Sequence, residues 1–236
     1  MEHRTQPVAF VALWQNKRSE YHATAQEEQE TSARIEEAFV NARARGARMY
    51  GRYGCRWSTG WQYFTFWLCP SFEVLEQTIA ELEAAGDFKF ADSRHIIGFP
   101  MDDQDMIDAE YLREGGPDPE RPIGFFAMWR RTDSYYHADP EAWERSDRAV
   151  REAFAYARSR GARMLGRYDC RWSNEWEYFT FWQVPSLEVL ESTMERLEPA
   201  GDFWFADSYH VIGTLEPHFR FGTHLQVNPE RAEGGY

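Results

Sequence analysis

Hydrophobic residues recur along the chain in two patterns, short apolar runs and a helical spacing. Residues 7–14 (PVAFVALW) and 123–129 (IGFFAMW) are apolar runs of strand length. Each run is followed by a segment in which apolar residues recur at i, i+3, i+4 and i+7, which predicts an amphipathic helix. The two sets are Ile35, Ala38, Phe39 and Ala42, and Val150, Ala153, Phe154 and Ala157.

The next part of each half is rich in aromatic residues and predicts two strands joined in a hairpin, with turns at 58–60 and 173–175. Ser71 and Ser186 can cap a second helix, and Gly86 and Gly201 can end it. A last strand follows at 90–98 (FADSRHIIG) and at 205–213 (FADSYHVIG). Each half therefore reads β-α-β-β-α-β.

The two halves are copies of one another. A shift of about 115 positions aligns GARMYGRYGCRWS, which begins at Gly46, with GARMLGRYDCRWS, which begins at Gly161. From Gly46 to Gly98 roughly 70% of positions are identical without a gap, so the chain arose by duplication. We expect a first repeat at 1–100, an acidic linker at 101–122, and a second repeat with a C-terminal tail at 123–236.

The order of elements is that of the ferredoxin-like split βαβ unit. Its sheet carries helices on one face, and a second sheet is the natural cover for the other face. The sequence therefore predicts an α+β protein in which two ferredoxin-like repeats form a dimeric α+β barrel within one chain.

Composition narrows the classes of partner. The chain has 236 residues and a formal charge of −13, which disfavours nucleic acid, because phosphate binding needs clustered Lys and Arg. No apolar run approaches the length of a membrane span, and three cysteines are too few for a disulfide framework. We expect a soluble cytoplasmic protein without a membrane partner, and leave a homodimer open.

In these features the chain resembles the dimeric α+β barrel superfamily. That superfamily includes small antibiotic-biosynthesis monooxygenases, muconolactone isomerase-like proteins, chlorite dismutase-like haem proteins and stress-responsive barrel proteins. The resemblance rests on element order and duplication and carries over no catalytic residue. It implies a cavity between sheet and helices or between the two sheets, used for small aromatic or polyketide-like molecules.

Strand alternation predicts which side chains face that cavity. With a turn at 58–60, one face carries Met49, Tyr53, Thr65 and Trp67 without any charge, so we expect it to pack on the helices. The opposite face should look into the barrel. Its ligand-binding candidates are Arg52, Arg167, Tyr50, Phe64, Phe66, Phe179 and Phe181, with Asp92 and Asp207 as the anionic partners of the arginines. A bulge at Gly51 or Gly54 would reverse this assignment.

Four histidines are the candidates for catalysis. His95 and His210 lie near the end of the last strand, and His22 and His137 follow the first strand. A neutral imidazole suits a general base or a metal or haem ligand, and it equally suits a hydrogen-bonded core. No metal-binding spacing is present, and the cysteines Cys55, Cys69 and Cys170 are expected to be buried hydrophobes. We predict no metal site.

The leading interpretation is an enzyme that acts on a small aromatic or conjugated, anionic molecule by oxygenation, isomerisation or cyclisation. No Gly-rich phosphate loop is present, which argues against a nucleotide cofactor. An arginine would hold a carboxylate or enolate, and His95 or His210 would move a proton. Two alternatives stay open: a chlorite dismutase-like protein that binds haem through a histidine, and a non-catalytic binding or stress-response module. The sequence does not distinguish which half holds the working site.

Overall fold

The computed structural model describes residues 6–17, 22–101 and 116–216, and it contains the predicted order of elements in both halves. The first half runs β1 (Val8–Asn16), α1 (Ala25–Ala44), β2 (Arg48–Gly54), β3 (Tyr63–Cys69), α2 (Phe72–Ala85), α3 (Asp87–Phe90) and β4 (Ala91–Pro100). The second half runs β5 (Ile123–Arg131), α5 (Asp133–His137), α6 (Pro140–Ser159), β6 (Arg163–Asp169), β7 (Tyr178–Val184), α7 (Leu187–Ala200), α8 (Asp202–Phe205) and β8 (Ala206–Leu215).

The helices begin and end where local chemistry favours it. Ser71 and Ser186 accept hydrogen bonds from the backbone N–H groups three residues later, as predicted for N-caps. Asp139 caps α6 in the same way and is followed by a proline in the first turn. Gly86 and Gly201 take the left-handed conformation that ends α2 and α7.

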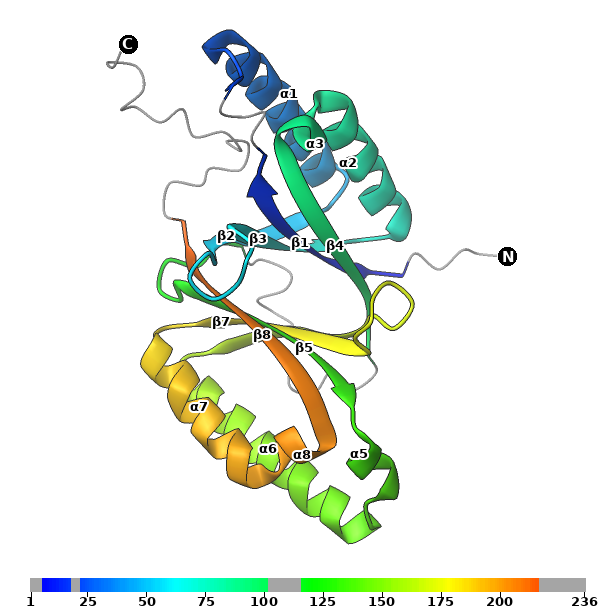
Figure 1. Ribbon diagram of the computed structural model, residues 1–236, viewed down its shortest axis with the longest axis vertical. Coiled ribbons are helices and arrows are strands. Elements are labelled where there is room, and N and C mark those ends of the chain that lie inside the picture. Colours follow the sequence, from blue (N-terminus) through cyan, green and yellow to red (C-terminus); the bar gives the residue numbers. More distant parts are fainter. Residues whose placement is uncertain (1–5, 18–21, 102–115, 217–236) are drawn as a thin grey trace.

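All eight strands form one closed antiparallel barrel in the order β1-β3-β2-β8-β5-β7-β6-β4. Each half contributes four adjacent strands, and the halves join at two seams. Tyr53 pairs with Leu215 at the β2–β8 seam, and Phe99 pairs with Asp169 at the β4–β6 seam. In Figure 1 the barrel lies in the middle, with α1–α3 on one side and α5–α8 on the other. The predicted dimeric α+β barrel is confirmed.

Side chains from both sheets pack together inside the barrel. Phe66 stacks on Phe181 across the barrel, with ring centroids 4.4 Å apart, and Tyr53 and Phe64 stack beside them. All four of these rings are fully buried. The predicted inward orientation of the phenylalanines is confirmed, and their rings lie where a cavity between the sheets was expected.

The predicted face of β2 is wrong beyond Tyr50. Gly51 has φ +136°, and the register of β2 against β3 shifts between Met49 and Arg52. This bulge turns Tyr50 and Tyr53 both into the barrel and leaves Arg52 on the helix-covered face, beside Thr65. Gly166 and Arg167 repeat the arrangement in β6.

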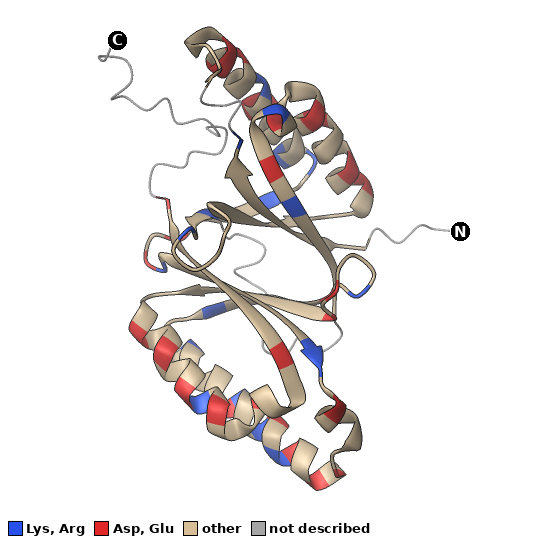
Figure 2. Ribbon diagram, viewed as in Figure 1, with Lys and Arg blue, Asp and Glu red and all other residues tan. Residues whose placement is uncertain are grey.

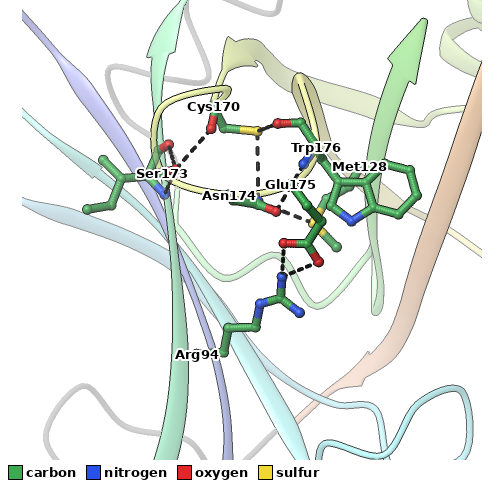
Figure 3. Close-up of polar contacts among 8 residues, drawn as sticks. Arg94, Met128, Cys170, Ser173, Asn174, Glu175 and Trp176 are labelled. Carbon is green, nitrogen blue, oxygen red and sulfur yellow. Dashed lines mark hydrogen bonds and ion pairs between the residues drawn. The ribbon is translucent and has the colours of Figure 1, made fainter. Parts of the chain in front are cut away.

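The hairpin turns are longer than predicted, since β2 ends at Gly54 and β3 begins at Tyr63. Each loop reaches across to the other half. Ser58 bridges the backbone of Ile212, donating to its carbonyl and accepting from its N–H, and Ser173 does the same at Ile97. Figure 3 shows the second loop, in which Glu175 also pairs with Arg94 on β4 at 2.5 Å. These contacts fix the rotation of one half against the other.

Charge lies mainly outside the barrel. In Figure 2 Asp and Glu are most frequent on the helices, while the strands are largely uncharged.

Residues 102–115 of the predicted linker and the tail from residue 217 lie outside the described residues, so the domain boundaries stay predictions. Within the described part, no helix is long and apolar enough to span a membrane. All three cysteines are buried free thiols.

We expect Gly51→Ala to lower the free energy of unfolding by about 1–3 kcal/mol, because a side chain at this φ is strained. The new methyl group would also lie 2.8 Å from the Tyr53 ring. Gly60→Ala is the matched control, since a methyl group there meets nothing within 4 Å. Urea unfolding measures both, and an equal effect of the two changes would contradict the bulge.

Candidate functional site

Arg167 and His210 lie at opposite ends of one row that crosses the second sheet. Arg167 pairs with Thr180, Thr180 with Ala127, and Ala127 with His210. All four residues line a cavity on the helix-covered face. Three interstrand spacings of about 4.8 Å separate the end residues by roughly 14 Å between Cα atoms. Ala127, in the middle of the row, has a small side chain and therefore projects little from the sheet into the cavity.

The cavity is enclosed between this sheet and the helices α6, α7 and α8, and has a volume of about 180 Å³. Its walls are aromatic, with Trp129 on one side of the row and Phe125 and Trp182 on the other. Trp143 and Tyr135 line it where it approaches the surface, and Trp143 is 40% exposed. The site can therefore receive a flat molecule from solvent.

Burial shifts the pKa of titratable groups that line the cavity. Burial lowers the pKa of His210, so the imidazole is neutral at pH 7 and can accept a proton. Burial raises the pKa of the Asp202 carboxyl, and the nearby Arg167 guanidinium opposes that rise. Arg167 also lies over the Trp129 ring, 5.4 Å from its centroid. Arg131, Asp147 and Arg151 also line the cavity, and Arg151 pairs with Asp147 at 2.9 Å, so arginines, carboxyl groups and a neutral base share it.

The first half contains an equivalent row of residues, but its cavity is smaller. Arg52, Thr65, Ala12 and His95 occupy the equivalent positions. The cavity there measures only about 40 Å³, and Arg52 does not line it. Arg52 is 3% exposed, stacks on Trp14 and Tyr63, and pairs with Glu216 at 3.0 Å. Burial lowers the pKa of His95 here too.

The other predicted site residues lie elsewhere. His22 and His137 are exposed and line neither helix-side cavity. Asp92 pairs with Lys17 and Asp207 with Arg130, so the expectation that they are partners of Arg52 and Arg167 is wrong. The remaining candidates belong to the buried core inside the barrel and line neither helix-side cavity: Tyr50, Phe64, Phe66, Phe179 and Phe181.

The sequence analysis did not select two acidic residues that line the cavities, Asp87 and Asp202. Each follows the glycine that ends a helix, α2 or α7. A signal was present, because the duplicated Gly-Asp-Phe places a carboxylate next to an aromatic residue in both halves. No sequence pattern pointed to Glu216 as a partner of Arg52.

The described residues contain no group of three or more His, Cys, Asp or Glu able to hold a metal ion. Burial raises the pKa of all three thiols to about 12, which leaves them unreactive at neutral pH.

Solved structures share this architecture. The chain resembles chlorite dismutase from Candidatus Nitrospira defluvii in complex with imidazole, with a TM-score of 0.72 and 12% identity over 89% of this chain and 91% of that chain. It also resembles the protein TA0507, whose assignment as a chlorite dismutase is provisional, with a TM-score of 0.70 and 13% identity over 92% and 96%.

The chain has the dimeric α+β barrel fold. At this level of identity the likeness concerns the fold, and no residue role is transferred. No family model matches the sequence, and no curated protein is significantly similar to it.

The Asp87 carboxyl gives the fold a specific pH dependence. Burial raises its pKa to about 6 from an ordinary 3.8, so the folded state disfavours the ionised form. The cost is absent below about pH 4, where both folded and unfolded states are protonated, and complete above about pH 6. A shift of about two pH units corresponds to about 3 kcal/mol at most.

We therefore expect Asp87→Asn to gain stability relative to the wild type between pH 4 and pH 7, by up to about 3 kcal/mol. Urea unfolding across this pH range measures the gain. Asp92→Asn, at an exposed ion pair, is the control and should change by less than about 1 kcal/mol. A pH-independent difference at Asp87 would refute the burial of its charge.

Proposed function

We propose that the chain binds a small, flat, conjugated carboxylate in the cavity of the second half and moves a proton on it. The observation that carries the proposal is the single row that places Arg167 and His210 at the ends of one aromatic cavity. A ring lying over Ala127 gains from burial against Trp129 and Phe125. Its carboxylate would meet the guanidinium in a charge-assisted hydrogen bond.

The chemistry that fits this geometry is an isomerisation through an enolate. His210, neutral because burial lowers its pKa, accepts a proton from a carbon next to a carbonyl group, and the C–H electron pair moves onto the carbonyl oxygen. Arg167 stabilises that negative oxygen or the adjacent carboxylate. Return of the proton to a different carbon completes the reaction. No oxidant is required.

The second half is favoured because its arginine lines the cavity, which is also the larger of the two matched cavities. Trp143 also lines the second cavity, and the equivalent position in the first half holds Glu28. An aromatic ring at this place suits a conjugated ligand, whereas a carboxylate would repel an anionic one.

Phenylpyruvate is a suitable probe, because it is an aromatic carboxylate whose CH2 group lies next to a keto group and can enolise, which conjugates the ring with the carboxylate. We expect Arg167→Met to weaken its binding by about 2–5 kcal/mol, since the ligand charge would be buried without its cation. Isothermal titration calorimetry measures the loss. Arg52→Met is the matched control: it should leave binding unchanged and instead lower stability by about 1–3 kcal/mol, because the Glu216 carboxylate loses its partner. Equal loss of binding in both variants would contradict the assignment to the second half.

Catalysis is tested separately from binding. Exchange of the C3 hydrogens of phenylpyruvate with deuterated solvent, followed by NMR, should exceed the uncatalysed rate. His210→Gln should abolish the excess while leaving affinity within about threefold, because the imidazole acts on the proton rather than the carboxylate. Tight binding without any exchange above background would leave a binding module and refute the enzymatic part.

Haem is the second candidate, favoured by the likeness to chlorite dismutase structures over nearly the whole chain. A neutral imidazole such as that of His210 is chemically suited to iron. The second-half cavity is too small for a haem, because its volume of about 180 Å³ lies below the roughly 300 Å³ at which cofactor and drug-sized sites begin. The Phe125 ring also lies edge-on to His210, with centroids 5.1 Å apart. The residues present do not fit a haem.

Titration with haemin tests this conclusion. We expect no saturable Soret band at one equivalent and no change in the spectrum on His210→Gln. A sharp band that His210→Gln removes would replace the isomerase proposal by the haem alternative.

A further inference from the structure

Arg131 reaches the second-half cavity from the end of β5. It lines the cavity together with Arg167 and His210, but it does not belong to their row. Arg131 follows Ala127 by four residues on the same strand, so the two Cα atoms lie roughly 13 Å apart on one face of the sheet. The cavity therefore has a cation at a place well separated from the row.

The Arg131 guanidinium packs against two aromatic rings. It lies 4.5 Å from the centroid of the Tyr135 ring and 5.2 Å from the centroid of the Tyr178 ring. A guanidinium that stacks on rings keeps its N–H groups at its edge, where they can bind a planar carboxylate through two parallel hydrogen bonds. The rings also restrict the side chain before a ligand arrives, which lowers the entropy that binding costs.

Arg131 forms no ion pair with the residues that the structure describes, although two carboxylates are near. Asp169 pairs with Arg171, and Glu177 accepts the backbone N–H of Arg131 at 3.3 Å. The pKa of Asp169 is lowered mainly by its hydrogen bond with Arg171, and the charge of Arg131 contributes less. The protein therefore balances the charge of Arg131 only in part.

Small side chains connect the row with Arg131. From His210, strand β8 leads back through Ser208 to Ala206, which pairs with Arg131. All four residues line the cavity. Trp129 pairs with Ser208, but its ring stacks on the tyrosine at the start of β7, with centroids 4.3 Å apart. A ligand that starts on the row can therefore extend along β8 toward Arg131.

The first half has an uncharged residue at the equivalent position. Asn16 ends β1 and pairs with Ala91, as Arg131 ends β5 and pairs with Ala206. The strand pairing is the same in both halves, and the side chain differs. The additional guanidinium thus accompanies the larger of the two matched cavities.

We propose that the ligand of the second-half cavity carries two carboxylates, one bound by Arg167 and the other by Arg131, so that the substrate class is a conjugated dicarboxylate. The inference rests on the proposed function. The second carboxylate would form charge-assisted hydrogen bonds beside Tyr135, where the cavity approaches the surface. Two separated points of attachment fix the orientation of the ring, and thereby the carbon that faces His210.

Phenylpyruvate and 4-carboxyphenylpyruvate are matched probes, because they differ by one carboxylate on the ring. We expect the wild type to bind the dianion at least about tenfold more tightly in isothermal titration calorimetry, because the second carboxylate gains a cationic partner. Arg131→Met should reduce this preference to less than about threefold. Arg130→Met is the control: the Arg130 side chain is 52% exposed, pairs with Asp207 and does not line the cavity, so the preference should remain.

Arg131→Asn copies the residue of the first half and serves as a second variant in case Arg131→Met does not fold, which thermal melting checks. Equal affinity of the wild type for the two probes would overturn the dicarboxylate inference and leave the proposed function standing. A preference that survives in a folded Arg131 variant would do the same, and so would an equal loss of affinity for both probes.

Failure of the proposed function gives a different pattern. Arg167→Met would then leave the affinity for both probes unchanged, whereas loss of the preference in Arg131→Met would still support the site for the second carboxylate. A wild type that binds neither probe would overturn both proposals.

Discussion

The stacking of aromatic rings between the two sheets is the constraint on which the rest of the structure depends. Each four-stranded sheet has helices on one face only and needs a cover for the other. The contact of Phe66 with Phe181 supplies that cover from the other half of the chain, and further buried rings surround it inside the barrel. The two matched cavities lie on the outer faces of the sheets, under the helices. This is where both copies of the arginine and histidine row lie.

The sequence predicted the elements and the barrel because these depend on signals that repeat along the chain. Apolar spacing, serine caps and terminal glycines are local, and the duplication supplied the second sheet. The orientation of Arg52 could not be obtained in the same way. Strand alternation has a period of two, so the one extra residue at Gly51 reverses every later side chain of β2. The sequence indicated that a glycine there could form a bulge, but only the register of β3 shows that it does.

The candidate site was predicted in part for the same reason. His210 and Arg167 were both selected from the sequence and line one cavity, yet the partners expected for the arginines, Asp92 and Asp207 on the last strands, pair with other residues. The structure pairs Arg52 with Glu216, which is 164 positions away and reaches it across the seam between halves. Contacts of this kind depend on how the barrel closes. No spacing along the chain encodes them.

Duplication within one chain lets the two sites change independently while the barrel stays the same. In a homodimer every substitution would change both sites at once, because both copies carry it. Here Glu216 lies 3.0 Å from Arg52 while Met101 occupies the matching place, and the backbone hydrogen bonds that follow β8 and β4 are the same. The ion pair gives the buried Arg52 guanidinium an anionic partner, without which its charge would be costly to bury. The two rows can therefore diverge in side chains while both halves keep the backbone pairing that closes the barrel.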